Sequence, residues 1–289
     1  MIPMDVRHYS AFAQIAEAEA GLYMPAAKQA FVASRLQRRL RMTGLQDFGL
    51  YLHLVREQTP EGRAERLQFI AALTTNVTSV FREPHHFAIL AAHLGAHETD
   101  ASNSKYRIWS AGCATGEEPL SIAATCRAVL GSDWHRKVKI LATDVDETVI
   151  ARARTPIDVA VLGEALSDLP DGIPTTGRRR AGTAEKLFAE LHIGIEYRQH
   201  NLLDPLIGYD NFDAIFCRNV TIYFSRPAQE AVHAMLRARL VPGGLLAVGH
   251  SERLLGALPP MSPAGRTAFV RTDDATCPRG KTGAAPSWP

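Results

Sequence analysis

The chain has 289 residues, of which 46% are hydrophobic and 21% are charged. This balance is typical of a soluble globular protein with one sizeable core and a smaller second domain, so the fold needs no disulfides or metal ions to be stable. The formal net charge of +2 is too small to indicate a nucleic-acid partner, and electrostatic recognition must come from local clusters.

The helical part comes first. Residues 5–74 show apolar residues at three- and four-residue spacing, as in Val32, Leu36 and Leu40. We predict an all-helical domain over residues 1–75. Residues 76–105 are predicted to be a connector with a helix from Pro84 to Leu94.

From Tyr106 onward, short apolar runs alternate with helical stretches, which indicates an α/β domain with a mostly parallel sheet over residues 106–272. The predicted strands are Tyr106 to Ser110, Val138 to Thr143, Ile193 to Arg198, Phe212 to Cys217 and Leu245 to Gly249. Weak periodicity predicts an inserted loop or small subdomain at about 154–192. The polar composition of residues 273–289 predicts a flexible tail.

Cysteine spacing and hydropathy indicate the compartment. The cysteines, Cys113, Cys126, Cys217 and Cys277, form no CxxC pair, so we expect free thiols in a reducing environment. No segment approaches the roughly 18 apolar residues of a membrane span, and the first ten residues lack a signal-peptide core. We therefore expect a cytoplasmic protein that does not insert into the membrane.

Metal binding is not expected. Glu83, His85 and His86 resemble a ligand set, but consecutive histidine side chains diverge on a helix.

The glycine-containing loop Ala111 to Glu118 follows the first predicted strand and begins a helix, an arrangement that places backbone amides beside a cofactor. Its spacing fits neither GxGxxG nor a P-loop. Glu117 and Glu118 stand where a dinucleotide-binding loop would meet a pyrophosphate, and two carboxylates would repel it. A cationic cofactor without phosphate suits the loop better, and S-adenosylmethionine is such a molecule.

Two further positions fit a nucleoside. Asp144 ends the second predicted strand, where an acid can accept hydrogen bonds from both ribose hydroxyls; the alternative is a cap for the helix that begins near Glu147. Asn201 follows the third strand, where its amide and adjacent backbone groups are placed to contact an adenine edge, although alone it would be an ordinary turn residue.

Several runs occur in a fixed order along the chain to about Phe269. They are Leu73 to Thr78 with Phe81 to Glu83, Trp109 to Pro119, Ala142 to Asp146, Asn201 to Leu203, Phe212 to Phe224, and Gly249 to Glu252. In this order they closely resemble the chemotaxis receptor glutamate methyltransferases, the CheR family. The resemblance implies a helical domain joined to a Rossmann-like methyltransferase domain, with receptor glutamates as substrates and glutamyl methyl esters as products.

The resemblance also implies site residues. Cofactor contacts with S-adenosylmethionine, or with its product S-adenosylhomocysteine, would fall partly in the connector, on Asn76, Thr78, Arg82, Glu117, Asp144, Asn201, Leu202, Arg218 and Asn219. Tyr223 would lie beside the transferred methyl group, although an isolated tyrosine there would suggest only a half-buried aromatic residue. We expect no general base, because the substrate carboxylate is already ionised at neutral pH. Arg82 and Tyr223 are the predicted catalytic residues, with Arg82 orienting the carboxylate.

Residues 28–41 carry basic side chains and no acid. Helical spacing places Lys28, Arg35, Arg38 and Arg39 within about 100° of arc, beside an apolar side, and Arg41 adds to the charge. A simple solvated face explains this pattern, and so does a nucleic acid or a membrane surface, yet there is no interleaved aromatic platform. The resemblance favours docking on the acidic methylation region of the helical bundle in the cytoplasmic domain of a transmembrane chemoreceptor. We expect the protein to be a monomer.

Two other functions share the same cofactor loop. One is a methyltransferase that acts on a small molecule or RNA. The other is a non-catalytic sensor that binds S-adenosylmethionine or S-adenosylhomocysteine.

Overall fold

A computed structural model describes residues 2–97, 105–155, 169–173, 184–209, 211–256 and 260–272. The predicted tail over 273–289 and most of the predicted insertion at 154–192 lie outside these residues. No helix in the described ranges is both long and apolar enough to cross a membrane.

The N-terminal domain consists of four α-helices and one 3-10 helix around an aromatic core. Its elements are α1 (Val6–Ala20), η1 (Ala26–Lys28), α2 (Gln29–Thr43), α3 (Phe48–Arg56) and α4 (Pro60–Leu73). Phe12 is fully buried and contacts the rings of Phe48, Tyr51 and Phe69 at centroid distances of 5.6–6.2 Å. Val32, Leu36 and Leu40 of α2 face the same core, as their spacing predicts.

The second domain is an α/β fold built on a seven-stranded sheet of order β3-β2-β1-β4-β5-β7-β6. The strands are β1 (Tyr106–Ala111), β2 (Val138–Asp144), β3 (Ile195–Gln199), β4 (Phe212–Cys217), β5 (Leu240–Val248), β6 (Met261–Gly265) and β7 (Ala268–Arg271). Strands β1 to β5 pair in parallel, and β7 and β6 continue the sheet in antiparallel pairing. The predicted fold class, with a helical domain before a Rossmann-like domain, is confirmed.

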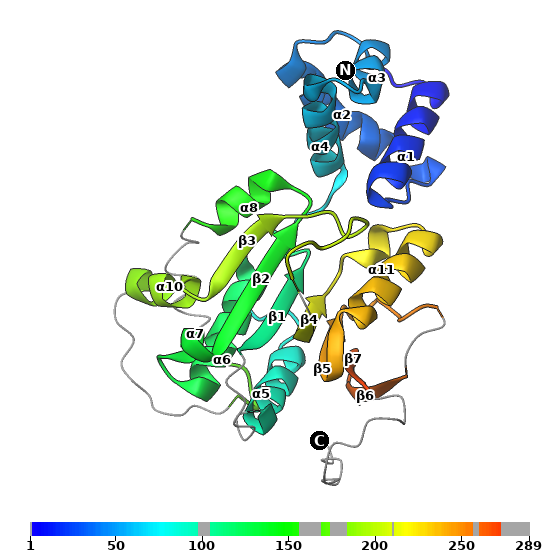
Figure 1. Ribbon diagram of the computed structural model, residues 1–289. Coiled ribbons are helices and arrows are strands. Elements are labelled where there is room, and N and C mark those ends of the chain that lie inside the picture. The colour runs from blue at the N-terminus through cyan, green and yellow to red at the C-terminus, as the bar shows by residue number, and fades with distance from the viewer. Residues whose placement is uncertain are drawn as a thin grey trace.

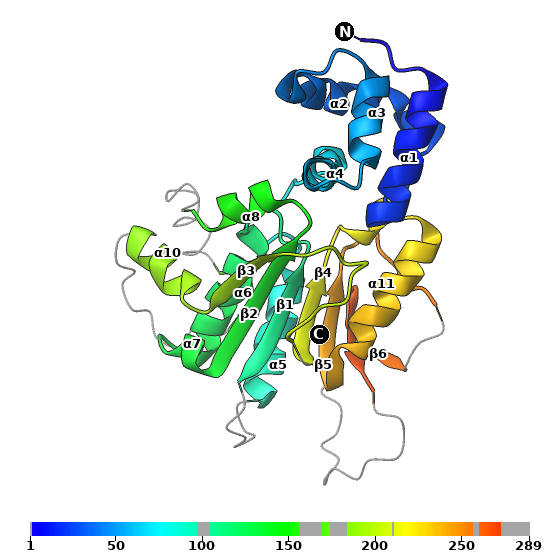
Figure 2. The same ribbon diagram turned by 45° about the horizontal axis from the view of Figure 1, so that its top comes forward.

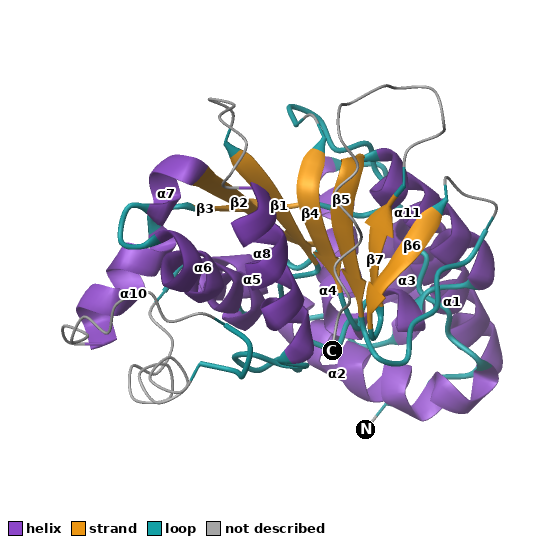
Figure 3. Ribbon diagram, turned by 90° about the horizontal axis from the view of Figure 1, so that it is seen from below, coloured by secondary structure: helices purple, strands orange, loops and turns teal. Residues whose placement is uncertain are grey.

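Helices cover both faces of the sheet (Figures 1 and 3). The helices that follow α4 are α5 (His85–His97), α6 (Glu117–Leu130), α7 (Trp134–Lys137), α8 (Glu147–Ala153), α10 (Ala184–His192), η2 (Thr221–Tyr223) and α11 (Arg226–Ala238). Alternate residues of β4 belong to different cores: Phe216 packs in the cluster that contains α5 and α6, whereas Ile215 packs in the cluster that contains α11. Both faces are therefore apolar, which explains the continuous apolar runs of the parallel strands.

Strand order reverses between β1 and β4, the place where open α/β sheets bind ligands at the carboxyl ends of their strands. The helical domain lies beyond this edge (Figures 1 and 2). One contact between the domains uses Gly21, which follows α1 and has a left-handed φ of 68°; a Cβ there would come within 2.7 Å of the Ala228 Cβ of α11. Glycine thus lets the two domains touch at this point.

The antiparallel edge was not predicted from the sequence. Strands β6 and β7 are short, and β6 contains Pro263 and ends at Gly265, which hide the alternation of a strand. They form because Ala268 and Phe269 pair with β5 and complete the sheet.

Candidate functional site

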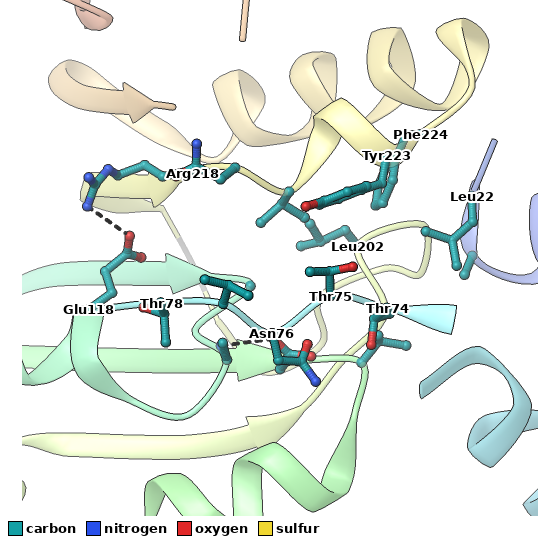
Figure 4. A pocket seen from close by; sticks show the side chains of 18 of the residues that line it. Leu22, Thr74, Thr75, Asn76, Thr78, Glu118, Leu202, Arg218, Tyr223 and Phe224 are labelled. Carbon is teal, nitrogen blue, oxygen red and sulfur yellow. Dashed lines mark hydrogen bonds and ion pairs between the residues drawn. The ribbon is translucent and has the colours of Figure 1, made fainter. Parts of the chain in front are cut away.

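A pocket with about 940 Å³ of space, including its open mouth, lies at the strand-order reversal, between the helical domain and the sheet. Figure 4 shows side chains from both domains converging on it. All the predicted cofactor and catalytic residues line the pocket except Glu117. The sequence runs that carry the family resemblance are therefore brought together in space.

Asp144 holds the glycine-containing loop in place. Its Oδ2 accepts a hydrogen bond from the Ala114 amide at 3.0 Å, and its Oδ1 accepts one from the Asp146 amide at 3.0 Å. Burial raises the pKa of this carboxyl group, although both hydrogen bonds act to lower it. The N-cap of α8 is Asp146, whose Oδ1 accepts from the Thr148 amide, so the capping interpretation of Asp144 is wrong.

Glu118, rather than Glu117, faces the pocket. The Glu117 carboxylate accepts a hydrogen bond from the Thr115 hydroxyl at 2.7 Å. Glu118 accepts from Ser110 at 2.7 Å and from the Arg218 guanidinium at 3.2 Å. Because Arg218 offsets the charge of Glu118, the carboxylates exclude a phosphate less strongly than the sequence suggests.

The segment between α4 and α5 lines the pocket without forming a helix or strand and carries Asn76, Thr78 and Arg82. Asn76 donates to the Asp146 carboxylate at 3.2 Å, which ties the segment to the N-cap of α8, just after β2. Arg82 Nη1 donates to the Val77 carbonyl at 2.9 Å, and Arg218 donates to the Arg82 carbonyl. The Arg82 side chain is thus held beside the pocket before any ligand binds.

Residues 200–202 form the opposite wall. The Asn201 amide is occupied by the protein itself, because its Oδ1 accepts from the Leu203 amide at 3.1 Å and its Nδ2 donates to the Glu19 carbonyl at 2.6 Å. Its backbone carbonyl is also occupied, because it accepts from the Asp204 amide at 2.9 Å. His200 also lines this wall, and its buried Nε2 has no hydrogen-bond partner. His200 was not predicted from the sequence as a site residue, although its position next to Asn201 could have indicated it.

Glu252 organises the loop after β4 and was also missed. Its carboxylate accepts hydrogen bonds from the amides of Asn219, Val220, Thr221 and Gly249 at 2.6–3.0 Å, and from the Thr221 hydroxyl at 2.8 Å. Asn219 has a left-handed φ of 59°, a strained conformation that these bonds stabilise. Its Oδ1 is buried without a hydrogen-bond partner and lies in the pocket lining.

Glu252→Ala should lower kcat about 100-fold, because small displacements of catalytic groups cost about that much and the loop carries Tyr223. Glu252→Gln, which keeps one acceptor oxygen, should lie between this variant and the wild type. Steady-state kinetics with saturating cofactor measure the effect, with the partly exposed Glu230→Ala as a control for loss of a carboxylate. Wild-type kcat in a folded Glu252→Ala protein would contradict this role.

Tyr223 connects the pocket to the helical domain. Its ring reaches into the pocket with the hydroxyl foremost (Figure 4). The Tyr23 amide donates to the Tyr223 carbonyl at 2.8 Å, and the Lys28 ammonium lies 5.7 Å from the centre of the Tyr223 ring. The N-terminal domain therefore contacts the predicted methyl-transfer residue directly.

The basic helix α2 does not present all its charges to solvent. Arg35, Arg38 and Arg41 are exposed, and Lys28 is half-buried. Arg39 forms a two-pronged ion pair with Glu65 at 2.9 and 2.6 Å, and Tyr51 donates to the same carboxylate at 2.7 Å. Arg39 therefore stabilises the domain, and its prediction as a docking residue needs correction.

The pocket residues suit S-adenosylmethionine. The unpartnered Asn219 Oδ1 can accept a hydrogen bond from an ammonium group, and the unpartnered His200 Nε2 is a further polar contact. Asp144 offers carboxylate oxygens at a strand end, where ribose hydroxyls are recognised in nucleotide-binding folds. Apolar surface comes from Leu202 and Val220.

Comparison with known proteins agrees with this site. Residues 7–74 match the family described as CheR methyltransferase, all-alpha domain, and residues 76–267 match CheR methyltransferase, SAM binding domain. The chain is 38% identical over 271 residues to a chemotaxis protein methyltransferase of Salmonella typhimurium, covering 92% of this chain and 91% of that protein. The Escherichia coli (strain K12) protein of the same name is 37% identical over 272 residues, with the same coverage. Chemotaxis protein methyltransferase 2 of Pseudomonas aeruginosa is 38% identical over 263 residues, covering 86% of this chain and 87% of that protein.

The predicted cofactor and the predicted enzyme class are confirmed by these matches. The chain belongs to the CheR family of S-adenosylmethionine-dependent methyltransferases.

Proposed function

We propose that this protein transfers a methyl group from S-adenosylmethionine to glutamate side chains in the cytoplasmic domains of chemotaxis receptors, and that it acts in the cytoplasm as a monomer. The observation that carries the proposal is one pocket that joins the nucleoside-type contact Asp144 to Arg82 and Tyr223. Its relatives are named chemotaxis protein methyltransferases, which supports a receptor as the substrate.

The chain's residues act by binding and orientation. Bound S-adenosylmethionine supplies an electrophilic methyl group on a positively charged sulfur. A glutamate with an ordinary pKa of about 4.3 is ionised at neutral pH, so no residue must remove a proton. Arg82 would orient the carboxylate so that one oxygen forms the new bond to carbon while the carbon–sulfur bond breaks and its electron pair stays on sulfur. Tyr223 would shape the path of the carboxylate towards the methyl group, and the bound receptor segment would exclude water from the pocket.

The direct test is to incubate the protein with methyl-labelled cofactor and receptor-containing membranes. We expect label on the receptor that alkali releases as methanol, because carboxyl methyl esters hydrolyse in base. Alkali-stable label would instead indicate an amine or RNA substrate. Cofactor binding without transfer to any receptor would favour the sensor, and either result would contradict the proposal.

Receptor docking is assigned to the exposed charges of α2, Arg35, Arg38 and Arg41, with the half-buried Lys28 nearer the pocket. Arg35→Glu combined with Arg38→Glu should raise the KM for receptor at least about tenfold with little change in kcat, because the two introduced carboxylates would repel the acidic surface of the receptor. Methylation should also fall with added salt. Arg226→Glu, an exposed basic residue on α11, is the matched control. Equal KM values in both proteins would exclude α2 as the docking surface.

A further inference from the structure

A cluster of one carboxylate and two histidines lies just before and within the first turn of α5, next to the pocket but outside its lining. Glu83, His85 and His86 each offer one donor atom, and these atoms lie within 4.8 Å of one another. The rings of His85 and His86 are only 4.1 Å apart, so the expectation that they diverge is wrong. They come together because both bond the same group.

That shared group is the Arg266 carbonyl. The Nε2 atoms of His85 and His86 lie 3.1 and 3.2 Å from it, and the Thr267 hydroxyl lies 3.0 Å from His86 Nε2. Since a carbonyl only accepts hydrogen bonds, His85 donates to it through Nε2–H. His86 Nε2 contacts both this carbonyl and the Thr267 hydroxyl, and donation to the carbonyl puts the His86 proton on Nε2 as well. This leaves both Nδ1 atoms with a free lone pair, and metal-binding histidines are commonly oriented through their other nitrogen in this way.

Two buried atoms in the cluster have no hydrogen-bond partner, His86 Nδ1 and Glu83 Oε2. They lie 3.6 Å apart, too far for a normal hydrogen bond. Two ligands of one tetrahedral zinc ion, with bonds of about 2.1 Å, stand about 3.4 Å apart. The other oxygen of Glu83 is held by His250 Nδ1 at 3.1 Å, which fixes the carboxylate with Oε2 directed at His86.

We propose that Glu83, His85 and His86 form a binding site for a divalent transition metal ion such as Zn²⁺, with Glu83 Oε2 and His86 Nδ1 as two of its ligands. Two imidazoles and one carboxylate favour Zn²⁺, Co²⁺ or Ni²⁺ over Mg²⁺ and Ca²⁺, which prefer oxygen. The half-buried His85 ring must move inward to reach bonding distance. A fourth ligand would be water, since the cluster supplies three.

Arg218 places a positive charge beside the cluster, and it connects this site to the pocket. Its Nη2 lies 3.6 Å from Glu83 Oε2, while its Nη1 contacts Glu118. The two carboxylates and the guanidinium together carry one net negative charge, so the cluster still attracts a cation. A bound ion would compete with Arg218 for Glu83 and shift Arg218 towards Glu118, at the wall of the pocket.

The test is a titration of tag-free, full-length protein with Co²⁺, in which the visible d–d absorption of the bound cobalt ion is measured. Zn²⁺ is then added to displace the Co²⁺. We expect one ion per chain, with bands typical of nitrogen and oxygen ligands. A strong near-ultraviolet band typical of cobalt–thiolate bonds would place the ion on a cysteine and overturn the proposal. So would the absence of binding at micromolar protein and metal.

His85→Ala and Glu83→Gln should each weaken Co²⁺ affinity at least about tenfold, as loss of a ligand requires. The His85 ring is half-buried, so its removal leaves the core closed. Glu83→Gln keeps the size of a side chain that is 13% exposed, so it leaves no cavity. The matched control is His53→Ala, which removes a histidine paired with Glu57 on the helical domain and 78% exposed. Unchanged affinity in His85→Ala, or an equal loss in His53→Ala, would refute the site; these readouts do not depend on methyl transfer.

Discussion

Arg82→Ala is expected to lower kcat by about 100- to 1000-fold, the range seen when one preorganised donor is removed from a reacting centre. The Arg82 side chain donates to the Val77 carbonyl, and its own carbonyl accepts from Arg218. The residues on either side, Phe81 and Glu83, have left-handed φ values of 51° and 55°. Such backbone strain is characteristic of functional sites, where the surrounding structure stabilises it. Holding the guanidinium in place is what an orienting role requires.

Single-turnover kinetics with saturating cofactor measure this effect, because Arg82 also lines the cofactor pocket. Arg82→Lys keeps the charge but loses the planar fork, so it should recover only part of the rate. Calorimetric titration with S-adenosylhomocysteine shows whether cofactor affinity changes as well. Wild-type turnover in Arg82→Ala would remove the orienting role.

The second large effect concerns stability. Arg39→Ala should lower the free energy of unfolding by about 3 kcal/mol or more, because it leaves a buried carboxylate without its counter-charge. The side chains of Arg39 and Glu65 are only 12% and 10% exposed, so solvent screens this pair weakly. Tyr51 would keep one hydrogen bond to Glu65 but no positive charge.

Arg38→Ala is the matched control, since Arg38 is the adjacent residue and is exposed. Its unfolding free energy should stay within about 0.5 kcal/mol of wild type, whereas its KM for receptor should rise. Urea unfolding measures the first quantity, and methylation kinetics measure the second. Equal stability of the two variants would show that the Glu65 pair contributes little.

Local sequence predicted the elements because their signals are local. The apolar runs matched β1, β2, β3 and β4 to within two residues, and the spacing of Val32, Leu36 and Leu40 identified the buried side of α2. The motif runs identified the pocket lining almost completely, since each run ends a strand or crosses the same sheet edge.

Contacts between distant residues were not predictable in this way. Whether Arg39 or Arg38 is free depends on Glu65, which lies 26 residues away from Arg39. Whether the Asn201 amide can reach a ligand depends on the Glu19 carbonyl of the other domain. A helical repeat gives the direction of a side chain but not its partner.

The sequence by itself determined the two-part architecture, the parallel sheet, the cofactor class and the family. Hydrophobic periodicity and strand-end motifs depend only on residues that are close together in the chain. Only the tertiary structure decided which charges are free, that Glu252 holds the Tyr223 loop, and that His85 and His86 converge on Arg266. These depend on buried hydrogen bonds and ion pairs between segments far apart in the chain, and burial forces each such group to find a partner wherever the fold supplies one.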